Sequence, residues 1–368
     1  MIYIIGAGLN GLCTSYYLSK MTRQPVKVIE CRKSYSMEAS YINGCQNYYS
    51  KILPLATMSK MNLGSYNFLP FLESYSLLWK ERKWFFSALK SIFYQKRDKQ
   101  LCSLLQPMAR YCFEDIVSDN MDNMDKMDNI DKVEPIVENG INMWGNYASN
   151  PMEFSKLVYH KCIERGVDFS FNTELKSVQF SKKENKIISI ETNPPLEKPF
   201  DPDKDVIIFC TGIYTRRFLD VPLLGFYGFS VINSYSNKPN NNKPNQINII
   251  DSMQYITLGG EDRIVSGVVI SNKLNASHEI YERLYIDAPG EKYCYARPIS
   301  PNGLPIIERY KNFMNVFVNT GQGFVGYTMA ALSGYLCASL VIKYMGYYSV
   351  DSVDSVDSVG VNIATRVA

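Results

Sequence analysis

The chain has 368 residues, and its 39 basic and 36 acidic residues leave a formal net charge of +3. This near balance, without an evident basic face, argues against a nucleic-acid partner. Nine scattered cysteines without a C-x-x-C pair, and only two histidines, disfavour a disulfide framework and a metal site. They favour a reducing, cytoplasmic compartment. The length predicts two closely joined domains.

The first thirty residues predict a dinucleotide-binding unit. An apolar run at 2–5 indicates a strand, 12–20 a helix and 26–29 a second strand that ends at Glu30. Between the first strand and the helix lies the G-x-G-x-x-G sequence Gly6, Ala7, Gly8, Leu9, Asn10 and Gly11. The three glycines permit a tight turn, close approach of a pyrophosphate and close helix packing. The helix N-terminus favours phosphate, and Glu30 suits ribose hydroxyls but disfavours NADP. This pattern alone does not separate FAD from NAD.

The next part of the chain is less specific. After Cys31, residues 38–46 form a polar loop rich in small residues that suits a ligand. Aromatic helices are expected at 68–94 and 101–117, both as packing elements, and an amphipathic helix at 151–165. Three biased segments predict an exposed insert, a loop and a frayed tail, at 121–132, 237–245 and 349–359.

Strands dominate the second half of the chain. Runs at 167–171, 175–180 and 187–192 indicate strands, and the buried run 206–209 leads into Thr211 and Gly212, where a parallel sheet would meet the dinucleotide again. Alternating segments predict a second, largely antiparallel sheet that covers the site, at 226–233, 254–258 and 263–270.

A second glycine-rich turn follows near the C-terminal end. The strand from Val316 leads through Thr320-Gly321-Gln322-Gly323 into an apolar stretch, 324–341. Polar residues interrupt this stretch, so a buried helix is expected rather than a membrane span. Its N-terminus would direct a partial positive charge at an electron-rich group, such as the pyrimidine edge of a flavin.

Taken in order, these motifs resemble the FAD-dependent D-amino acid oxidase superfamily, whose members include D-amino acid dehydrogenase, glycine oxidase and sarcosine oxidase. The resemblance covers about residues 1–341. It rests on the N-terminal glycine motif with Glu30, the 38–46 loop, Thr211-Gly212, Arg297-Pro298 and 320–328. Family members commonly have His where this chain has Gln322, an acid where it has Asn302, and Thr where it has Ala39.

The resemblance implies a role for each matching residue. Arg297 would clamp a substrate carboxylate, as a guanidinium can with two parallel hydrogen bonds. The family's cofactor contacts fall on the glycine motif, Glu30 and Cys31, and on Ser40, Asn43, Gly44, Gln46, Leu175, Thr211, Gly212, Gly321, Gln322, Gly323, Val325, Gly326, Tyr327 and Thr328. No Cys or His is placed for covalent attachment, so non-covalent FAD is expected.

The expected fold is α/β, a Rossmann-type FAD-binding domain with a mixed-sheet α+β substrate domain. The FAD-binding domain would comprise 1–50, 140–215 and 297–345, the substrate domain 51–139 and 216–296, and a flexible tail 346–368. The expected reaction oxidises an amine or amino acid by hydride transfer to flavin N5, giving an imine and then an oxo acid. A hydroxy acid or sugar-derived substrate, or a catalytically silent flavin protein, stays open. Oxygen, a quinone and another protein all stay open as electron acceptors.

Overall fold

The structure is a computed structural model of the whole chain. It describes residues 1–41, 46–47, 49, 52–54, 75–118, 135–138, 141–148, 150–234, 246–250, 253–258, 261–274, 290–311 and 313–346. The three biased segments of the sequence, 121–132, 237–245 and 349–359, lie outside these residues.

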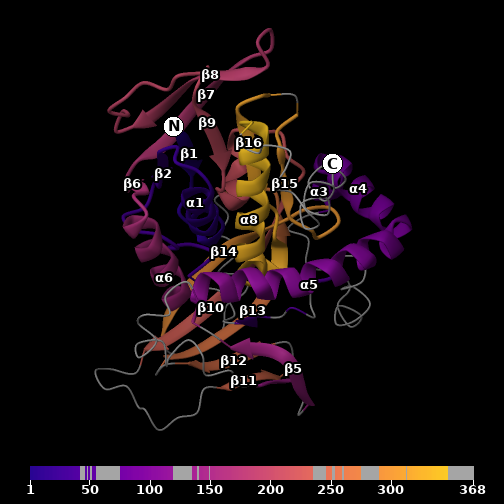
Figure 1. Ribbon diagram of the computed structural model, residues 1–368. Helices are drawn as coiled ribbons and strands as arrows, with labels where there is room; N and C mark the ends of the chain where they lie inside the picture. Colours follow the sequence, from indigo (N-terminus) through magenta and orange to yellow (C-terminus); the bar gives the residue numbers. More distant parts are fainter. Residues whose placement is uncertain are drawn as a thin grey trace.

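A six-stranded sheet forms one half of the protein (Figure 1). Its order is β15-β16-β9-β1-β2-β6, and all neighbours are parallel except β15 and β16. Its strands are β1 (Ile2–Ile5), β2 (Val26–Ile29), β6 (Asp168–Ser170), β9 (Val206–Phe209), β15 (Ile306–Arg309) and β16 (Val316–Thr320). Because β1, β9 and β16 are buried along their whole length, they read as continuous apolar runs in the sequence.

Long helices pack beside this sheet: α1 (Leu9–Met21), α5 (Gln95–Ser118), α6 (Pro151–Glu164) and α8 (Gly326–Tyr344). In the contact of α1 with α8, a Cβ on Gly334 would stand 2.6 Å from the backbone carbon of Cys13. Residues 323–344 are long and apolar enough to span a membrane, but 78% of the most apolar window is buried inside the protein. The helix is therefore buried, as the sequence predicts.

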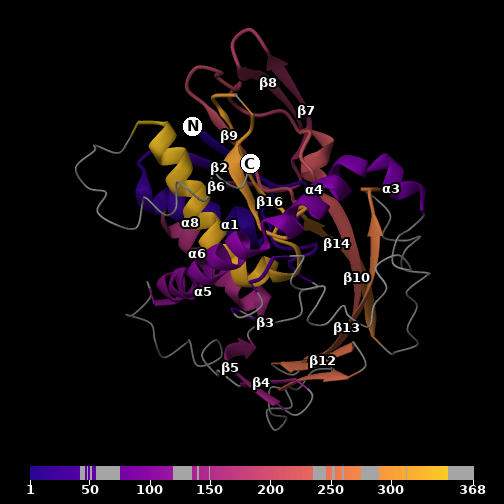
Figure 2. The same ribbon diagram turned by 90° about the vertical axis from the view of Figure 1, so that its right-hand side faces the viewer.

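An eight-stranded sheet forms the second half, and Figure 2 shows its long strands beside the first sheet. Its order is β14-β10-β13-β12-β11-β4-β5-β3, and every pair is antiparallel except β11 with β4. Its strands are β3 (Gln46–Asn47), β4 (Pro135–Glu138), β5 (Ile141–Ala148), β10 (Leu224–Ser234), β11 (Gln246–Ile250), β12 (Met253–Leu258), β13 (Glu261–Ser271) and β14 (Glu291–Ile299). The predicted covering sheet is confirmed.

The sheets divide the chain near, but not at, the expected boundaries. β5 lies within a segment assigned to the FAD-binding domain, and β14 crosses the expected boundary at 297, yet both belong to the eight-stranded sheet. A strand belongs to one sheet or the other because of pairing with strands that are distant in the sequence, and no local sequence pattern predicts this pairing. The division into two domains stays a prediction.

Several smaller elements complete the fold. β7 (Glu174–Ser181) and β8 (Lys186–Asn193) form a separate antiparallel hairpin. Two short 3₁₀ helices, η4 (Gly212–Arg217) and η5 (Gly323–Val325), follow β9 and β16. The helix expected at 68–94 is described from residue 75 and is broken into α3 (Ser76–Lys80) and α4 (Arg82–Phe93). Trp84 is packed as expected, but Trp79 and Phe93 are exposed, which corrects the expectation that this segment serves packing alone.

Candidate cofactor and substrate site

A cavity of about 660 Å³ lies at the carboxyl ends of the parallel strands. Ile5 ends β1, Ile29 ends β2, Cys210 follows β9 and Gln322 follows β16, and all four line this cavity. The cavity extends to β14 of the second sheet, so both halves of the protein form its wall. Ligands of open α/β sheets bind at this edge, where strand order reverses and helix N-termini converge.

The glycine turn after β1 forms one end of the cavity. Gly6 adopts φ +99°, a left-handed backbone that favours glycine. The backbone amide of Ala7 donates to Glu30 Oε2 at 2.7 Å, and the amide of Arg32 donates to Glu30 Oε1 at 2.8 Å. The Glu30 carboxylate is thus fixed at the end of β2, with lone pairs left for further donors.

The start of α1 presents a site for a phosphate. Its first turn has no acidic residue, and its N-cap residue, Gly8, has no side chain to bond the helix amides. The Leu9 amide donates to Ser40 Oγ at 3.2 Å, which ties the following loop to this helix end. Because an uncapped helix N-terminus offers N–H groups and partial positive charge, it suits a pyrophosphate.

Charged side chains gather near Glu30. Arg32 Nε donates to Glu38 Oε1 at 2.8 Å, and Cys31 Sγ lies 3.3 Å from Glu30 Oε1. Burial raises the pKa of the Glu38 carboxyl, and the Arg32 cation opposes this shift only partly. Burial, with the Glu30 carboxylate, raises the pKa of the Cys31 thiol to about 12, so this thiol is protonated at neutral pH.

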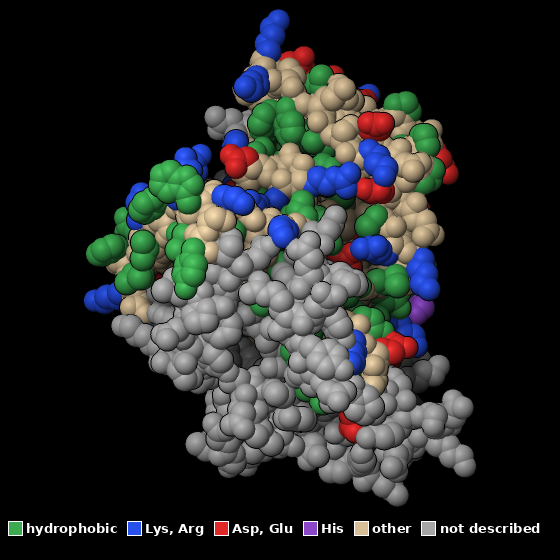
Figure 3. Space-filling model, turned by 180° about the vertical axis from the view of Figure 1, so that it is seen from behind, with side chains coloured by type: hydrophobic (Ala, Val, Ile, Leu, Met, Phe, Trp, Pro, Cys, Tyr) green, Lys and Arg blue, Asp and Glu red, His purple; other side chains and the backbone are tan. Residues whose placement is uncertain are grey.

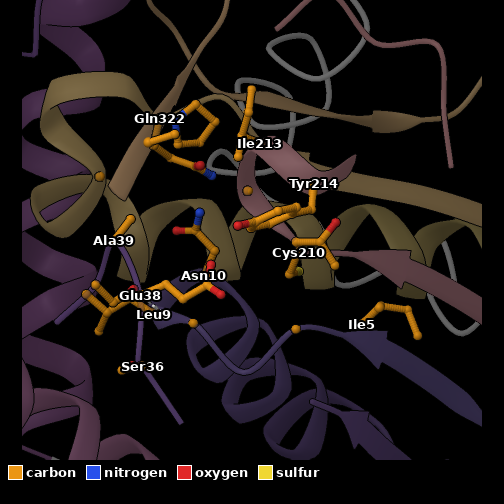
Figure 4. Close-up of a pocket in the computed structure, with 18 of the residues that line it drawn as sticks. Ile5, Leu9, Asn10, Ser36, Glu38, Ala39, Cys210, Ile213, Tyr214 and Gln322 are labelled. Atoms are coloured by element: carbon orange, nitrogen blue, oxygen red, sulfur yellow. Dashed lines mark hydrogen bonds between the residues drawn. The ribbon is translucent and has the colours of Figure 1, made fainter. Parts of the chain in front are cut away.

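The middle of the cavity is formed after β9. Thr320 Oγ1 donates to the Gly212 carbonyl at 3.0 Å, which joins the turns that follow β9 and β16. η4 then places Tyr214 in the cavity, where Figure 4 shows its ring beside Ile213 and Cys210. Burial raises the pKa of the Tyr214 phenol to about 12. Residues of η4 therefore line the cavity together with Thr211 and Gly212, for which the sequence predicts a second contact with the cofactor.

A buried amide lies at the β16–α8 turn. Gln322 is 2% exposed, and its Nε2 donates to Asn319 Oδ1 at 2.7 Å. Asn319 Nδ2 donates in turn to Thr14 Oγ1 on α1 at 3.0 Å. Gln322 Oε1 has no hydrogen-bond partner in the structure. In Figure 4 the side chains of Gln322 and Asn10 extend into the same space, and both residues line the cavity.

Arg297 lies at the substrate side. It stands on β14 opposite Phe226 of β10, and its guanidinium carbon lies 5.9 Å from the ring centroid of Phe324. Burial lowers the pKa of the guanidinium, and no neighbouring charge contributes to this shift. Among the described residues, no hydrogen bond or ion pair engages Arg297. A partly buried cation without a counter-ion therefore faces the cavity.

Most of the sequence-predicted residues line this one cavity. Lining residues are Gly6, Gly8, Leu9, Asn10, Glu30, Cys31, Ser40, Leu175, Thr211, Gly212, Arg297, Gln322, Gly323, Val325, Gly326, Tyr327 and Thr328. Three others do not line it: Ala7 bonds Glu30, Gly321 adopts φ +81° in the turn, and Gly11 packs against Gly6. Asn43, Gly44 and the side chain of Gln46 lie outside the described residues.

Sequence reasoning missed other lining residues: Ser36, Met37, Thr173, Glu174, Ile213, Tyr214, Arg217 and Phe218. Those of η4 directly follow the Thr211-Gly212 signal and could have been found by extending it. No group of three or more His, Cys, Asp or Glu side chains among the described residues is arranged to hold a metal ion.

Comparisons with known proteins identify the family. Residues 1–340 match the model of the FAD-dependent oxidoreductase family (DAO), so the chain belongs to that family. D-amino acid dehydrogenase of Vibrio atlanticus is 26% identical over 208 residues, which is 51% of this chain and 48% of that protein. The enzyme of that name from Granulibacter bethesdensis is 22% identical over 411 residues, 92% of this chain and 95% of that protein. The chain thus spans about half the length of the first of these relatives and nearly all of the second.

Solved structures share the fold. Glycine oxidase from Bacillus cereus superposes with a TM-score of 0.52 at 16% identity, covering 96% of this chain and 99% of that one. L-α-glycerophosphate oxidase from Mycoplasma pneumoniae, solved with FAD bound, gives 0.55 at 15% identity, covering 94% of each chain. The expected fold, a Rossmann-type FAD-binding half with a mixed-sheet second half, is confirmed.

The residues around the cavity fit FAD, the cofactor of this family. Glu30 can accept from ribose hydroxyls, and the uncapped N-terminus of α1 suits the pyrophosphate. The helix α8 begins at Gly326, and its N-terminal end lines the cavity, so its partial positive charge would favour the negative charge that a bound flavin gains on reduction.

Proposed function

We propose that this protein oxidises a small amine or amino acid bearing a carboxylate, with FAD as its cofactor. The observation that carries the proposal is the unpaired guanidinium of Arg297 in the cavity that also contains Glu30 and the start of α1. D-amino acid dehydrogenases among the relatives support the substrate class.

Arg297 suits a carboxylate for a physical reason. A buried cation without an anion is unfavourable, and its pKa is lowered by burial accordingly. A substrate carboxylate would supply the missing counter-ion through two parallel hydrogen bonds. Phe324 and Ala296, which flank Arg297, are apolar and strengthen this pairing by excluding water. Substrate orientation is therefore the main contribution of this end of the cavity.

The proposed reaction needs little acid–base chemistry from the protein. The substrate, as the neutral amine, loses its α-hydrogen as hydride and becomes an iminium ion, which loses a proton to give an imine. Water converts the imine to an oxo acid and ammonia. FAD, when bound, supplies the acceptor for the two electrons. Arg297 holds the carboxylate, and the described residues beside it on β14, Ala296 and Pro298, do not titrate. Such a step depends on alignment of the α-carbon.

We also propose that FAD is bound without a covalent bond and that the protein is cytoplasmic. No His lines the described cavity, and its two cysteines are protonated, since burial raises the pKa of Cys31 and of Cys210 to about 12. A weak nucleophile of this kind does not favour attachment to the flavin. The nine cysteines without a C-x-x-C pair support a reducing compartment.

Steady-state kinetics of Arg297 variants test the function. We expect Arg297→Met to raise the KM for an amino acid about 100-fold or more, with a smaller change in kcat, because the bidentate pair is lost. The KM of Arg297→Lys should lie between those of the wild type and Arg297→Met. An amine without a carboxylate should be turned over alike by all three, and Arg23→Met, an exposed change elsewhere, should match the wild type. An unchanged KM in Arg297→Met would remove the basis of the assignment.

A further inference from the structure

The segment α3–α4 is fixed to the protein along one face. Trp84 is 2% exposed, and its Nε1 donates to the carbonyl of Ile299, two residues beyond Arg297 on β14, at 3.1 Å. Glu81, at the break between the two helices, accepts from Arg216 at 2.6 Å and from Asn272 at 2.8 Å. These anchors from three other elements fix the rotation of the helices, so the opposite face must point outward.

The outward face is strongly apolar. Trp79 is 75% exposed, Phe86 62% and Phe93 87%, and Leu89 and Ile92 are also exposed. Figure 3 shows hydrophobic side chains gathered on the side of the molecule where α3 and α4 lie, with Lys and Arg side chains around them. Large apolar side chains scattered singly are ordinary, but a contiguous group on one helix face indicates an interaction surface.

The charge of the same segment is one-sided. Residues 76–93 contain four Lys and Arg but only one acid, Glu81, a net charge of +3 that equals the total of the whole chain. Lys96, Arg97 and Lys99 follow at the start of α5, together with Asp98. Both acids are turned inward: Glu81 bonds Arg216, and Asp98 is 2% exposed. Among the described residues of α3 and α4, the outward face therefore carries Lys and Arg side chains without an exposed acid, although the whole sequence is nearly balanced in charge.

Cations and apolar rings alternate along the outward face of α4. Lys83, Phe86, Lys90 and Phe93 are spaced three or four residues apart, so they lie on one side of the helix. All four are exposed. A lysine stem can lie along apolar surface while its ammonium reaches a polar layer beside it. This arrangement is typical of helices that lie in the plane of a membrane surface.

We propose that α3–α4 docks this protein peripherally on a membrane surface that contains anionic lipid. The rings of Trp79, Phe86 and Phe93 enter the boundary between headgroups and acyl chains, and the lysines contact lipid phosphates. A second copy of the chain is disfavoured, because a two-fold interface would bring two strongly positive faces together.

Vesicle co-sedimentation of the full-length, FAD-loaded protein tests this proposal. The probes are vesicles of phosphatidylcholine alone and of phosphatidylcholine with phosphatidylserine. Phe86→Ser with Phe93→Ser removes two exposed rings, and Lys83→Gln with Lys90→Gln removes two exposed charges. The matched controls are Ile163→Ser with Met314→Ser, and Lys182→Gln with Lys183→Gln, which are exposed side chains on other elements.

We expect the wild type to bind the phosphatidylserine vesicles, with weaker binding at high salt and at least about tenfold weaker partition to phosphatidylcholine. Each α4 double variant should lose about tenfold in partition, and the controls should retain wild-type binding. Flavin absorbance confirms that each variant is folded and loaded.

Four outcomes would overturn the proposal. One is no binding of the wild type to anionic vesicles at low salt. Another is binding that depends on the lysines but not on the phenylalanines, which would indicate adsorption by charge alone. The third is a dimer in light scattering that Phe86→Ser with Phe93→Ser dissociates, which would assign the face to self-association. A single-stranded RNA that competes vesicles off only through this face would likewise reassign it to nucleic acid.

Discussion

The carboxylate of Glu30 accepts a hydrogen bond from the backbone amide of Ala7 at 2.7 Å. This contact joins the end of β2 to the glycine turn after β1, across 23 residues of sequence. It means that Glu30 has a structural partner before any ligand is considered, and that ribose hydroxyls would bind a carboxylate already fixed in place.

Replacing this carboxylate should weaken the binding of FAD. We expect Glu30→Gln to raise the Kd for FAD about tenfold to 100-fold, since hydrogen bonds to a charged acceptor are worth about 1.5–3 kcal/mol. Titration of the apoprotein with FAD, followed by flavin fluorescence, measures this. Glu197→Gln, an exposed acid without a described partner, is the control. Equal affinity in Glu30→Gln and the control would show that Glu30 does not contact the cofactor.

Alanine substitutions at two glycines of the same motif should have different effects. A Cβ on Gly11 would stand 1.9 Å from the carbonyl oxygen of Gly6, whereas a Cβ on Gly8 would meet only Ser40 Oγ, at 3.4 Å. Gly11→Ala should therefore lower the free energy of unfolding by about 1–3 kcal/mol or more. Gly8→Ala should leave the stability of the apoprotein unchanged but weaken the binding of FAD, because its methyl group would stand where a pyrophosphate approaches. Thermal unfolding and FAD titration of both variants separate the two effects, and a reversed pattern would contradict this account.

The Gln322 amide should contribute to stability. In Gln322→Leu, the buried Asn319 Oδ1 loses its donor, so we expect the free energy of unfolding to fall by about 1–3 kcal/mol. Gln322→His keeps an N–H donor and should lose less. Chemical denaturation of both variants provides the measurement. If the two variants were equally stable, the bond to Asn319 would have no energetic role.

Glu308 should make the protein less stable as pH rises. It lies on β15, and burial raises the pKa of its carboxyl. A folded-state pKa above the unfolded value means that the native state binds more protons, so stability falls as pH rises through the interval between the two values. Glu308→Gln should thus be more stable than the wild type at pH 7, with the advantage gone below the unfolded pKa of about 4.3. Chemical denaturation at pH 7 and at a pH below about 4.3 tests this. The control is Glu184→Gln, because the side chain of Glu184 is exposed. A variant no more stable than wild type at pH 7 would contradict the prediction.

The sequence predicts those features of the site that local patterns encode. Each of these features needs a particular residue at a particular place on one strand–turn–helix unit, so the sequence alone indicates it. Examples are the turn with Gly6 and Gly8, the acid Glu30 and the β16–α8 turn. The same holds for the buried strands, whose continuous apolar runs are visible in the chain.

Features that depend on distant pairing could not be predicted. The bond from Trp84 to Ile299 spans 215 residues, and only this packing distinguishes Trp84 from the exposed Trp79. Likewise, the charge of α4 becomes one-sided only because Glu81 turns toward Arg216. Tyr214 lies in the cavity because it belongs to η4, and a helix as short as η4 has no periodic pattern from which the sequence could predict it.

The visible spectrum of the purified protein under anaerobic conditions, before and after addition of amines, tests directly whether this is an amine-oxidising flavoprotein. We expect the absorption bands of oxidised flavin and their bleaching by at least one member of a panel of D-amino acids, glycine and sarcosine. Flavin bands that none of these compounds bleaches, but that a hydroxy acid or glycerol phosphate does, would contradict the proposed substrate class. A colourless protein that also fails to take up added FAD would contradict the assignment of the cavity itself.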